Sequence, residues 1–410
     1  MPSLPSVPQA VKDGVKLTAL AVWLADSYHV YRYVEDYYRE DNDDTYDDDR
    51  LAEDRRVLAL YADDCAPASL VDKATFDAAL EHLRNELKTA DPSEGMWSPD
   101  DPALKVLAES AAFLGGARAT FLQLAQPFIA QGIKLHSKLE SGVRGRFMRT
   151  FKYVFGMNFG TQGEMFQAAR TVRALHEPVH GEISEQGSNV VFTTGSKFNA
   201  HQVHAIRWVA STLVETAIFQ YEMIVNHLSE AEKDHLVKGG SKMLRLFGVV
   251  PDQHDPQTWR EFRRMHSAMW RSPALQVSRG AKETAEFLLL PPSVLNQPLL
   301  DMVWWTTFVT MPPKLGSQFY GRSVSWFDKV LFALWTGLVR FVYRLLPKSF
   351  RQLAAYTQYR KRTRGLWPHE SALAYVSATA TNVLLDQAMP ERDPEVARVH
   401  VMKKLDAKAF

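Results

Sequence analysis

The feature that most constrains the fold is a helical repeat of apolar residues in the middle of the chain. Between residues 206 and 228 these side chains recur at intervals of three or four, which places them on one stripe of a long buried helix. They are Ile206, Val209, Leu213, Ala217, Tyr221, Ile224 and Leu228. Alternating apolar and polar residues are nearly absent, and NVVFTT (189–194) is the one good strand candidate. The sequence therefore predicts an all-α fold.

Helix starts are predicted by pairs in which a capping residue precedes Glu or Gln by three positions. Asn199 with Gln202 shows this pattern at the start of the long helix. Ser229 with Glu232 and Thr258 with Glu261 predict the starts of two further helices.

The composition is that of a globular protein, with 410 residues of which 46% are hydrophobic. A single cysteine, Cys65, excludes an internal disulfide and a multi-cysteine metal site, and it favours a reducing compartment. The first residues show no secretory signal. The longest charge-free apolar runs, 302–311 and 331–339, are shorter than the roughly 18 residues that span a bilayer. We expect a cytoplasmic protein without a transmembrane segment.

The net charge of +1 conceals a strong asymmetry. Residues 1–110 hold 24 acidic and 11 basic side chains, whereas the remaining 300 hold 23 acidic and 37 basic ones. The acidic run 35–56 lacks the turn glycine and the terminal glutamate of a calcium loop, so it predicts a solvated loop. Residues 340–364 contain eight basic and no acidic side chains between aromatic ones. They predict either peripheral membrane contact or pairing with the acidic N-terminal segment, and no nucleic-acid-binding module accompanies them.

Residues 176–180 read HEPVH, the pattern of a zinc protease helix. That motif needs an unbroken helix that presents both histidines on one face. Pro178 and the following Gly181 end or kink the helix, so His176 and His180 are not predicted to bind zinc together. Residues 316–323 (GSQFYGRS) imitate a phosphate-binding loop but follow no buried strand. No G-x-S-x-G or G-x-G-x-x-G motif is present, so hydrolase and dinucleotide-binding functions lack support.

Five histidines fall between residues 136 and 204, and each taken alone is most simply a structural residue. They are His136, His176, His180, His201 and His204. Arg146, Arg149 and Thr150 lie on one helical face. Arg173 precedes His176 by three residues and shares its face. Histidine on a helix with arginine and hydroxyl groups nearby is the chemistry that haem requires, since iron takes an imidazole and the propionates take polar donors.

Several blocks of the sequence, in order, resemble the oxygenase family typified by the mycophenolate-pathway oxygenase and the bacterial latex clearing proteins, or rubber oxygenases. The resemblance covers roughly residues 110–275, with a weaker echo at 344–351. The blocks are FLQLAQPFIAQGIKLHSKL, RGRFMRTFKYVFGMNFG, ARTVRALHEPVHG, NAHQVHAIRWVASTLVETAI and LFGVVPDQHDPQTWREF. This resemblance implies a globin-like helical core and a bound haem b.

The resemblance also implies roles for single residues. His176 matches the family's proximal ligand to the haem iron, and Arg146 and Thr150 match residues of the haem-pocket helix. Arg149 stands where latex clearing proteins carry a lysine that caps the distal iron position. His136 is retained as a pocket residue, whereas Gln126 replaces a histidine found in many relatives. Arg173, on the face of His176, is a further candidate for contact with the haem.

The residues and the resemblance together predict an acidic N-terminal helical segment (1–100), a haem-binding oxygenase core (101–290) and a C-terminal helical extension (291–410). The predicted function is oxidation of an apolar, unsaturated small molecule by dioxygen at haem b iron, with Arg146, Arg149 and Thr150 in catalytic positions. Two alternatives stay open: a haem-binding or gas-sensing protein without turnover, and a haem-free lipid-binding protein on the same scaffold.

Overall fold

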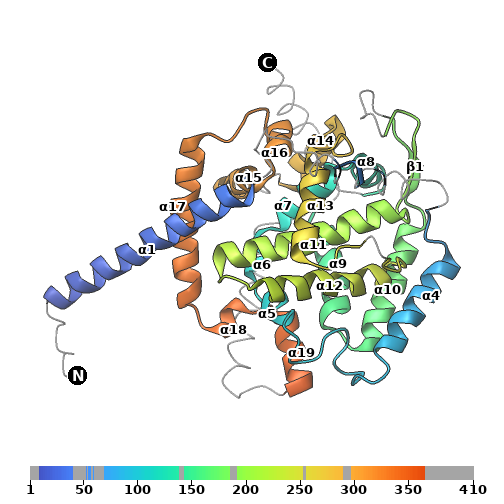
Figure 1. The fold of residues 1–410 in the computed structure, drawn as a ribbon, viewed down its shortest axis with the longest axis horizontal. Coiled ribbons are helices and arrows are strands. Elements are labelled where there is room, and N and C mark those ends of the chain that lie inside the picture. The colour runs from blue at the N-terminus through green and yellow to red at the C-terminus, as the bar shows by residue number, and fades with distance from the viewer. Residues whose placement is uncertain are drawn as a thin grey trace.

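A computed structural model gives the structure of the protein. It describes residues 9–39, 52, 54–56, 59, 69–137, 143–184, 192–252, 255–289 and 297–364, with backbone only at 9–15, 113, 143–148 and 299. Helices make up nearly all of its regular structure, so the all-α prediction is confirmed (Figure 1).

The helices and strands follow one another along the chain in two groups. The first group consists of α1 (Gln9–Tyr37), α4 (Lys73–Glu86), α5 (Leu104–Leu107), α6 (Ala111–Leu114), α7 (Gly116–Leu124), α8 (Pro127–His136), α9 (Val143–Phe159), α10 (Gln162–His176), β1 (His180–Glu182) and β2 (Lys197–Asn199). The second consists of α11 (Val203–Ile224), α12 (Glu230–Leu246), α13 (Trp259–Arg271), α14 (Arg279–Leu288), α15 (Gln297–Thr310), α16 (Pro313–Tyr320), α17 (Trp326–Leu345), α18 (Lys348–Arg351) and α19 (Ala354–Arg364).

The helix predicted from the apolar repeat is α11, and it runs through the centre of the molecule (Figure 1). It packs against α5, α6, α7, α12, α1 and α17, so it is buried on most of its circumference. Its predicted cap was wrong by one turn, because the helix begins at Val203 behind Gln202. Asn199 ends β2 instead, and its N–H donates to the Gln202 side chain across a turn before the helix (3.0 Å).

The capping boxes predicted at Ser229–Glu232 and Thr258–Glu261 are confirmed at the starts of α12 and α13. In each box the hydroxyl accepts from the backbone N–H of the glutamate, and the glutamate accepts from the backbone N–H of the cap. The strand predicted at 189–194 is not found: residues 189–191 lie outside the described part, and 192–194 form no strand. The two-stranded antiparallel ribbon is β1–β2, with His180 opposite Asn199.

The acidic N-terminal and basic C-terminal segments pair with each other at several points. Asp26 of α1 accepts from Arg340 and Arg344 of α17 (3.1 and 2.5 Å). Glu35 pairs with Lys329 (2.5 Å), and Asp100 pairs with Arg364. Intramolecular pairing is therefore confirmed for these residues. Most of the acidic run 35–56 lies outside the described residues, although Asp54 binds Arg271 (2.7 Å).

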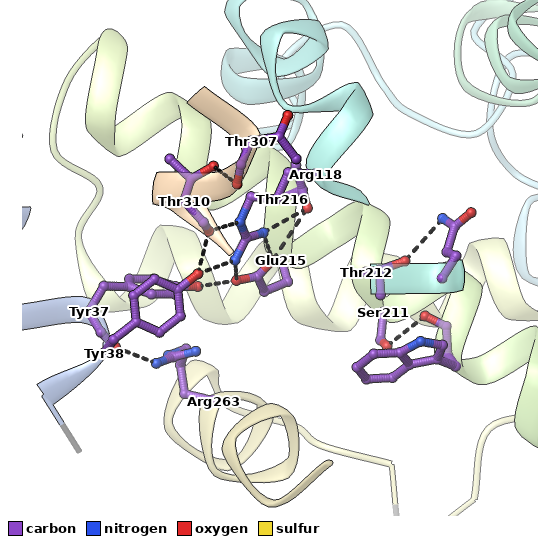
Figure 2. Close-up of polar contacts among 12 residues, drawn as sticks. Tyr37, Tyr38, Arg118, Ser211, Thr212, Glu215, Thr216, Arg263, Thr307 and Thr310 are labelled. Atoms are coloured by element: carbon purple, nitrogen blue, oxygen red, sulfur yellow. Dashed lines mark hydrogen bonds and ion pairs between the residues drawn. The ribbon is translucent and has the colours of Figure 1, made fainter. Parts of the chain in front are cut away.

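A buried network around Arg118 joins five helices (Figure 2). The Arg118 guanidinium forms an ion pair with Glu215 of α11 and donates to the Thr310 carbonyl of α15 (2.7 Å). Tyr38, which follows α1, accepts from Arg118 (2.8 Å), and the Tyr37 hydroxyl donates to Glu215 (2.6 Å). Burial alone would raise the pKa of Glu215, but the Arg118 charge and its hydrogen bonds outweigh burial and lower that pKa to about 2.

We expect Arg118→Met to lower the free energy of unfolding by about 3–5 kcal/mol, because it leaves the Glu215 carboxylate buried and unpaired. Lys73→Met, at the exposed Lys73–Asp77 pair, serves as the control and should cost less than about 1 kcal/mol. Denaturant unfolding of the two variants measures the difference. Equal small losses would contradict the assignment of a buried ion pair.

His266 of α13 gives a second prediction, on acid sensitivity. The ring is fully buried against Trp208 and Phe262, and neither of its nitrogens has a hydrogen-bond partner among the described residues. Burial lowers its pKa to about 3, with the Arg263 and Arg118 charges acting in the same direction and Glu215 opposing them. Between about pH 6.5 and 3 the unfolded chain therefore binds the extra proton, so stability falls as the pH falls through this window.

His266→Phe should consequently flatten the decline in stability between pH 6.5 and 4. Urea unfolding at several pH values tests this expectation, and an unchanged slope would refute it.

Candidate functional site

The helix hairpin α9–α10 brings the predicted site residues to one end. Thr161 and Glu164 form a capping box that starts α10 directly after α9 ends, so the two helices run antiparallel. They pack closely at Gly156, where an added Cβ would lie 3.5 Å from the Ala168 Cβ. In an antiparallel pair with this register, Arg146, Arg149 and Thr150 are level with the last turn of α10, which ends at His176.

His176 is the last residue of α10 and is half-buried. The helix ends there as predicted, because Pro178 cannot continue the backbone ladder. The chain then turns back: Val179 N–H donates to the His176 carbonyl (2.9 Å), and Ala200 N–H donates to the Val179 carbonyl (2.9 Å). These bonds bring the His176 ring to 6.4 Å, between centroids, from the ring of His201.

His201 is buried, with 8% of its surface exposed. Its Nε2 lies 3.4 Å from the Glu177 Oε2. Burial lowers the pKa of His201, the nearby Arg173 charge lowers it further, and Glu177 opposes both. At neutral pH the His201 imidazole is therefore uncharged, and a neutral ring stands beside His176.

The zinc-protease geometry is absent. His180 is the first residue of β1, so it does not share a helical face with His176. Its backbone carbonyl lies 3.0 Å from the Nε2 of His136, the last residue of α8. Within the part of the chain that the structure describes, no group of three or more His, Cys, Asp or Glu residues could hold a metal ion.

The predicted arginines and threonine divide into two groups. Arg149 and Thr150 are exposed on α9, and the backbone of Arg146 continues the same helix. Arg173 turns away from this helix: it donates to the Val71 carbonyl (3.0 Å) and stacks on the Phe76 ring (4.9 Å) of α4. The structure thus brings His176 and His201 together, places His136 on the adjoining ribbon, and directs Arg173 toward α4.

Two residues of this cluster received no role from the sequence, His201 and Glu177. His201 was visible only as one of five histidines, and the turn at 177–200 that folds it onto His176 leaves no periodic signal. His204, three residues further on, has a different environment, since its ring is buried between Phe128 and Phe192.

A cavity of about 710 Å³ lies elsewhere, between the α5 region and α17–α19. Its lining carries charges of both signs and includes none of the predicted site residues.

The fold and this cluster define an all-α protein with a histidine-centred site at the open end of a helix hairpin. The chain belongs to the family described as ER-bound oxygenase mpaB/B′/rubber oxygenase, catalytic domain, whose family model matches residues 104–365. The family suspected from the sequence blocks is thereby confirmed, and with it an oxygenase class. No curated protein and no solved structure matches the chain significantly.

The charges around His201 give a prediction with opposite signs. Arg173→Gln should raise the pKa of His201, because it removes a cation, whereas Glu177→Gln should lower it, because it removes the neighbouring carboxylate. Histidine NMR titration of the protein without added cofactor measures both shifts. Arg170→Gln, one turn earlier on the exposed side of α10, is the matched control and should leave the His201 pKa in place. Shifts of the same sign for Arg173→Gln and Glu177→Gln would contradict this arrangement.

Proposed function

We propose that the protein is a haem b-dependent oxygenase in which His176 is the iron ligand and dioxygen oxidises an apolar, unsaturated substrate. The observation that carries the proposal is the position of His176, half-buried at the end of α10 beside the neutral His201, in a chain of an oxygenase family.

The donor set fits haem chemistry. A macrocycle supplies four ligands to its iron, so the protein needs to offer a single imidazole on one side. His176 offers that imidazole at a helix end, where the chain turns away at Glu177 and Pro178. Arg149 and Thr150 add an exposed cation and hydroxyl on the neighbouring helix, which are the groups that bind propionates.

The residues of the chain would act mainly by binding and orientation. Arg146 and Thr150 would contact a propionate or line the pocket, and His136 would fix the β1 backbone through the His180 carbonyl. Arg149 keeps its proton at neutral pH, so it serves as a fixed positive charge and not as an iron ligand of the lysine type. Arg173 would act indirectly, because its charge helps to keep the buried His201 neutral. The haem, when bound, supplies the redox chemistry of dioxygen.

Cleavage of a carbon–carbon double bond is the reaction that suits an apolar hydrocarbon and the rubber oxygenase relatives named by the family description. One dioxygen adds one oxygen atom to each alkene carbon and yields two carbonyl groups, so the reaction balances without an external reductant. An apolar substrate offers the protein little to hydrogen-bond, and it would be held by shape and by exclusion of water.

Haem retention tests the ligand assignment. Purified protein should show a Soret band, and acid–acetone should extract the pigment because the chain has no C-x-x-C-H attachment motif. His176→Ala should lose most of the haem, since it removes the proposed protein–iron bond. Arg146→Ala and Thr150→Ala should give intermediate losses, each removing a polar contact worth about 1–3 kcal/mol.

The matched control is His180→Ala, which removes the other histidine of the same pentapeptide and should retain haem. Loss of haem from His180→Ala with retention by His176→Ala would reverse the ligand assignment. A folded, colourless protein that does not take up added haemin would refute the proposed function.

A further inference from the structure

Helix α17 is oriented with its polar residues inward. Arg340, only 6% exposed, donates from Nε to Asp26 (3.1 Å) and from Nη1 to the Met223 carbonyl (3.0 Å). Asp328 is buried at the start of the helix, where it accepts from Ser325 and Arg322. Gly337 allows α1 to approach closely, since any Cβ there would collide with Ser27. The charged side of α17 is thus used up within the protein.

The outward side of α17 is apolar along its whole length. Phe327 and Leu345, near its two ends, are 65% and 69% exposed. The exposed residues at intervals of three or four are Phe327, Leu331, Trp335, Leu338, Val342 and Leu345. A surface helix in water normally shows the reverse arrangement, with its polar face outward.

The N-terminal half of α1 extends this apolar surface. α1 packs across α17 and projects beyond it, away from the rest of the molecule (Figure 1). Its exposed large apolar side chains are Leu17, Leu20, Val22, Leu24 and Tyr28. Together with the outward side of α17 they form one surface, here named the α1–α17 face (residues 17–28 and 326–346). Contiguous exposed apolar surface of this kind marks a site of interaction.

The charges around the α1–α17 face have a single sign. Across residues 16–28 and 326–348 the exposed ionisable side chains are Lys16, Arg344 and Lys348, whereas Asp26 and Asp328 are buried. The face also exposes Trp326, Trp335 and Tyr28, whose amphipathic rings suit the boundary between lipid and water. Apolar and aromatic residues with a basic border are the composition of a helix that lies in a membrane interface.

We propose that the α1–α17 face binds flat on the surface of a bilayer that contains anionic lipids. α17, with 20 residues, would lie along the surface over about 30 Å. No described helix is long and apolar enough to cross a membrane, which agrees with binding in the plane. A symmetric dimer through this face would bring two identical basic borders together without an exposed acid to neutralise them. The proposal is independent of the haem chemistry.

This surface differs from the one expected from the basic segment 340–364. In that segment Arg340 binds Asp26, Arg362 donates to the Phe159 carbonyl (2.7 Å), and Arg364 pairs with Asp100. The proposal keeps Arg344 and Lys348 as the basic border and assigns the insertion to the apolar residues that precede them.

Vesicle co-sedimentation of the full chain tests the proposal, with phosphatidylcholine vesicles that contain either no anionic lipid or 30% phosphatidylserine. We expect binding to the anionic vesicles that weakens as salt is added. Phe327→Glu/Leu345→Glu should reduce that binding at least tenfold, because each residue contributes about 1.5–3 kcal/mol when buried. Lys348→Glu should reduce binding about fivefold on anionic vesicles only, from about 1 kcal/mol per basic residue.

Val250→Glu is the matched control, since it also replaces an exposed apolar residue but follows α12 and lies outside the face. It should bind as the wild type does, and thermal unfolding should show that all variants fold. Absent wild-type binding, or equal binding by Phe327→Glu/Leu345→Glu and Val250→Glu, would overturn the proposal. A wild-type dimer in light scattering that this double variant dissociates, without vesicle binding, would overturn it in favour of self-association.

Discussion

The buried ion pair between Arg118 and Glu215 is the interaction on which the arrangement of the helices depends. Two charges removed from water are tolerated only when the geometry satisfies both, and here every donor of Arg118 points at an acceptor from a different helix. The pair fixes α7 against α11, and through Tyr37, Tyr38 and Thr310 it also fixes the end of α1 and of α15. A shift of any one of these helices would leave a buried charge without its partner.

The position of α1 in turn determines what α17 exposes. Because the C-terminal end of α1 is held by the Arg118 network, its Asp26 meets Arg340 and Arg344, and Trp23 donates to the Leu334 carbonyl (3.0 Å). These contacts turn the charged side of α17 toward the protein. The apolar side is left outward as a consequence, so the exposed α1–α17 face follows from the way in which the buried charges are satisfied.

The sequence was sufficient where local physics decides the structure. The three- and four-residue repeat predicted α11, and hydroxyl–glutamate pairs predicted the starts of α12 and α13, because these signals act within a few residues. The predicted strand at 189–194 and the cap at Asn199 failed, since a turn and a short ribbon displaced both. An apolar stripe also does not reveal whether it faces the core or the outside, so the orientation of α17 and the approach of His201 to His176 needed the tertiary structure.

The pentapeptide HEPVH shows how geometry separates two chemistries that share one pattern. A zinc ion bound directly by side chains needs several ligands from the protein, and the literal motif supplies two only if the helix is continuous. Pro178 ends α10 at His176, and the backbone turn sends His180 into β1, so a single imidazole is left at the helix end. One imidazole is what a metal already held by a macrocycle requires. The residue that removes the protease geometry is therefore the same residue that creates the geometry the proposed haem site needs.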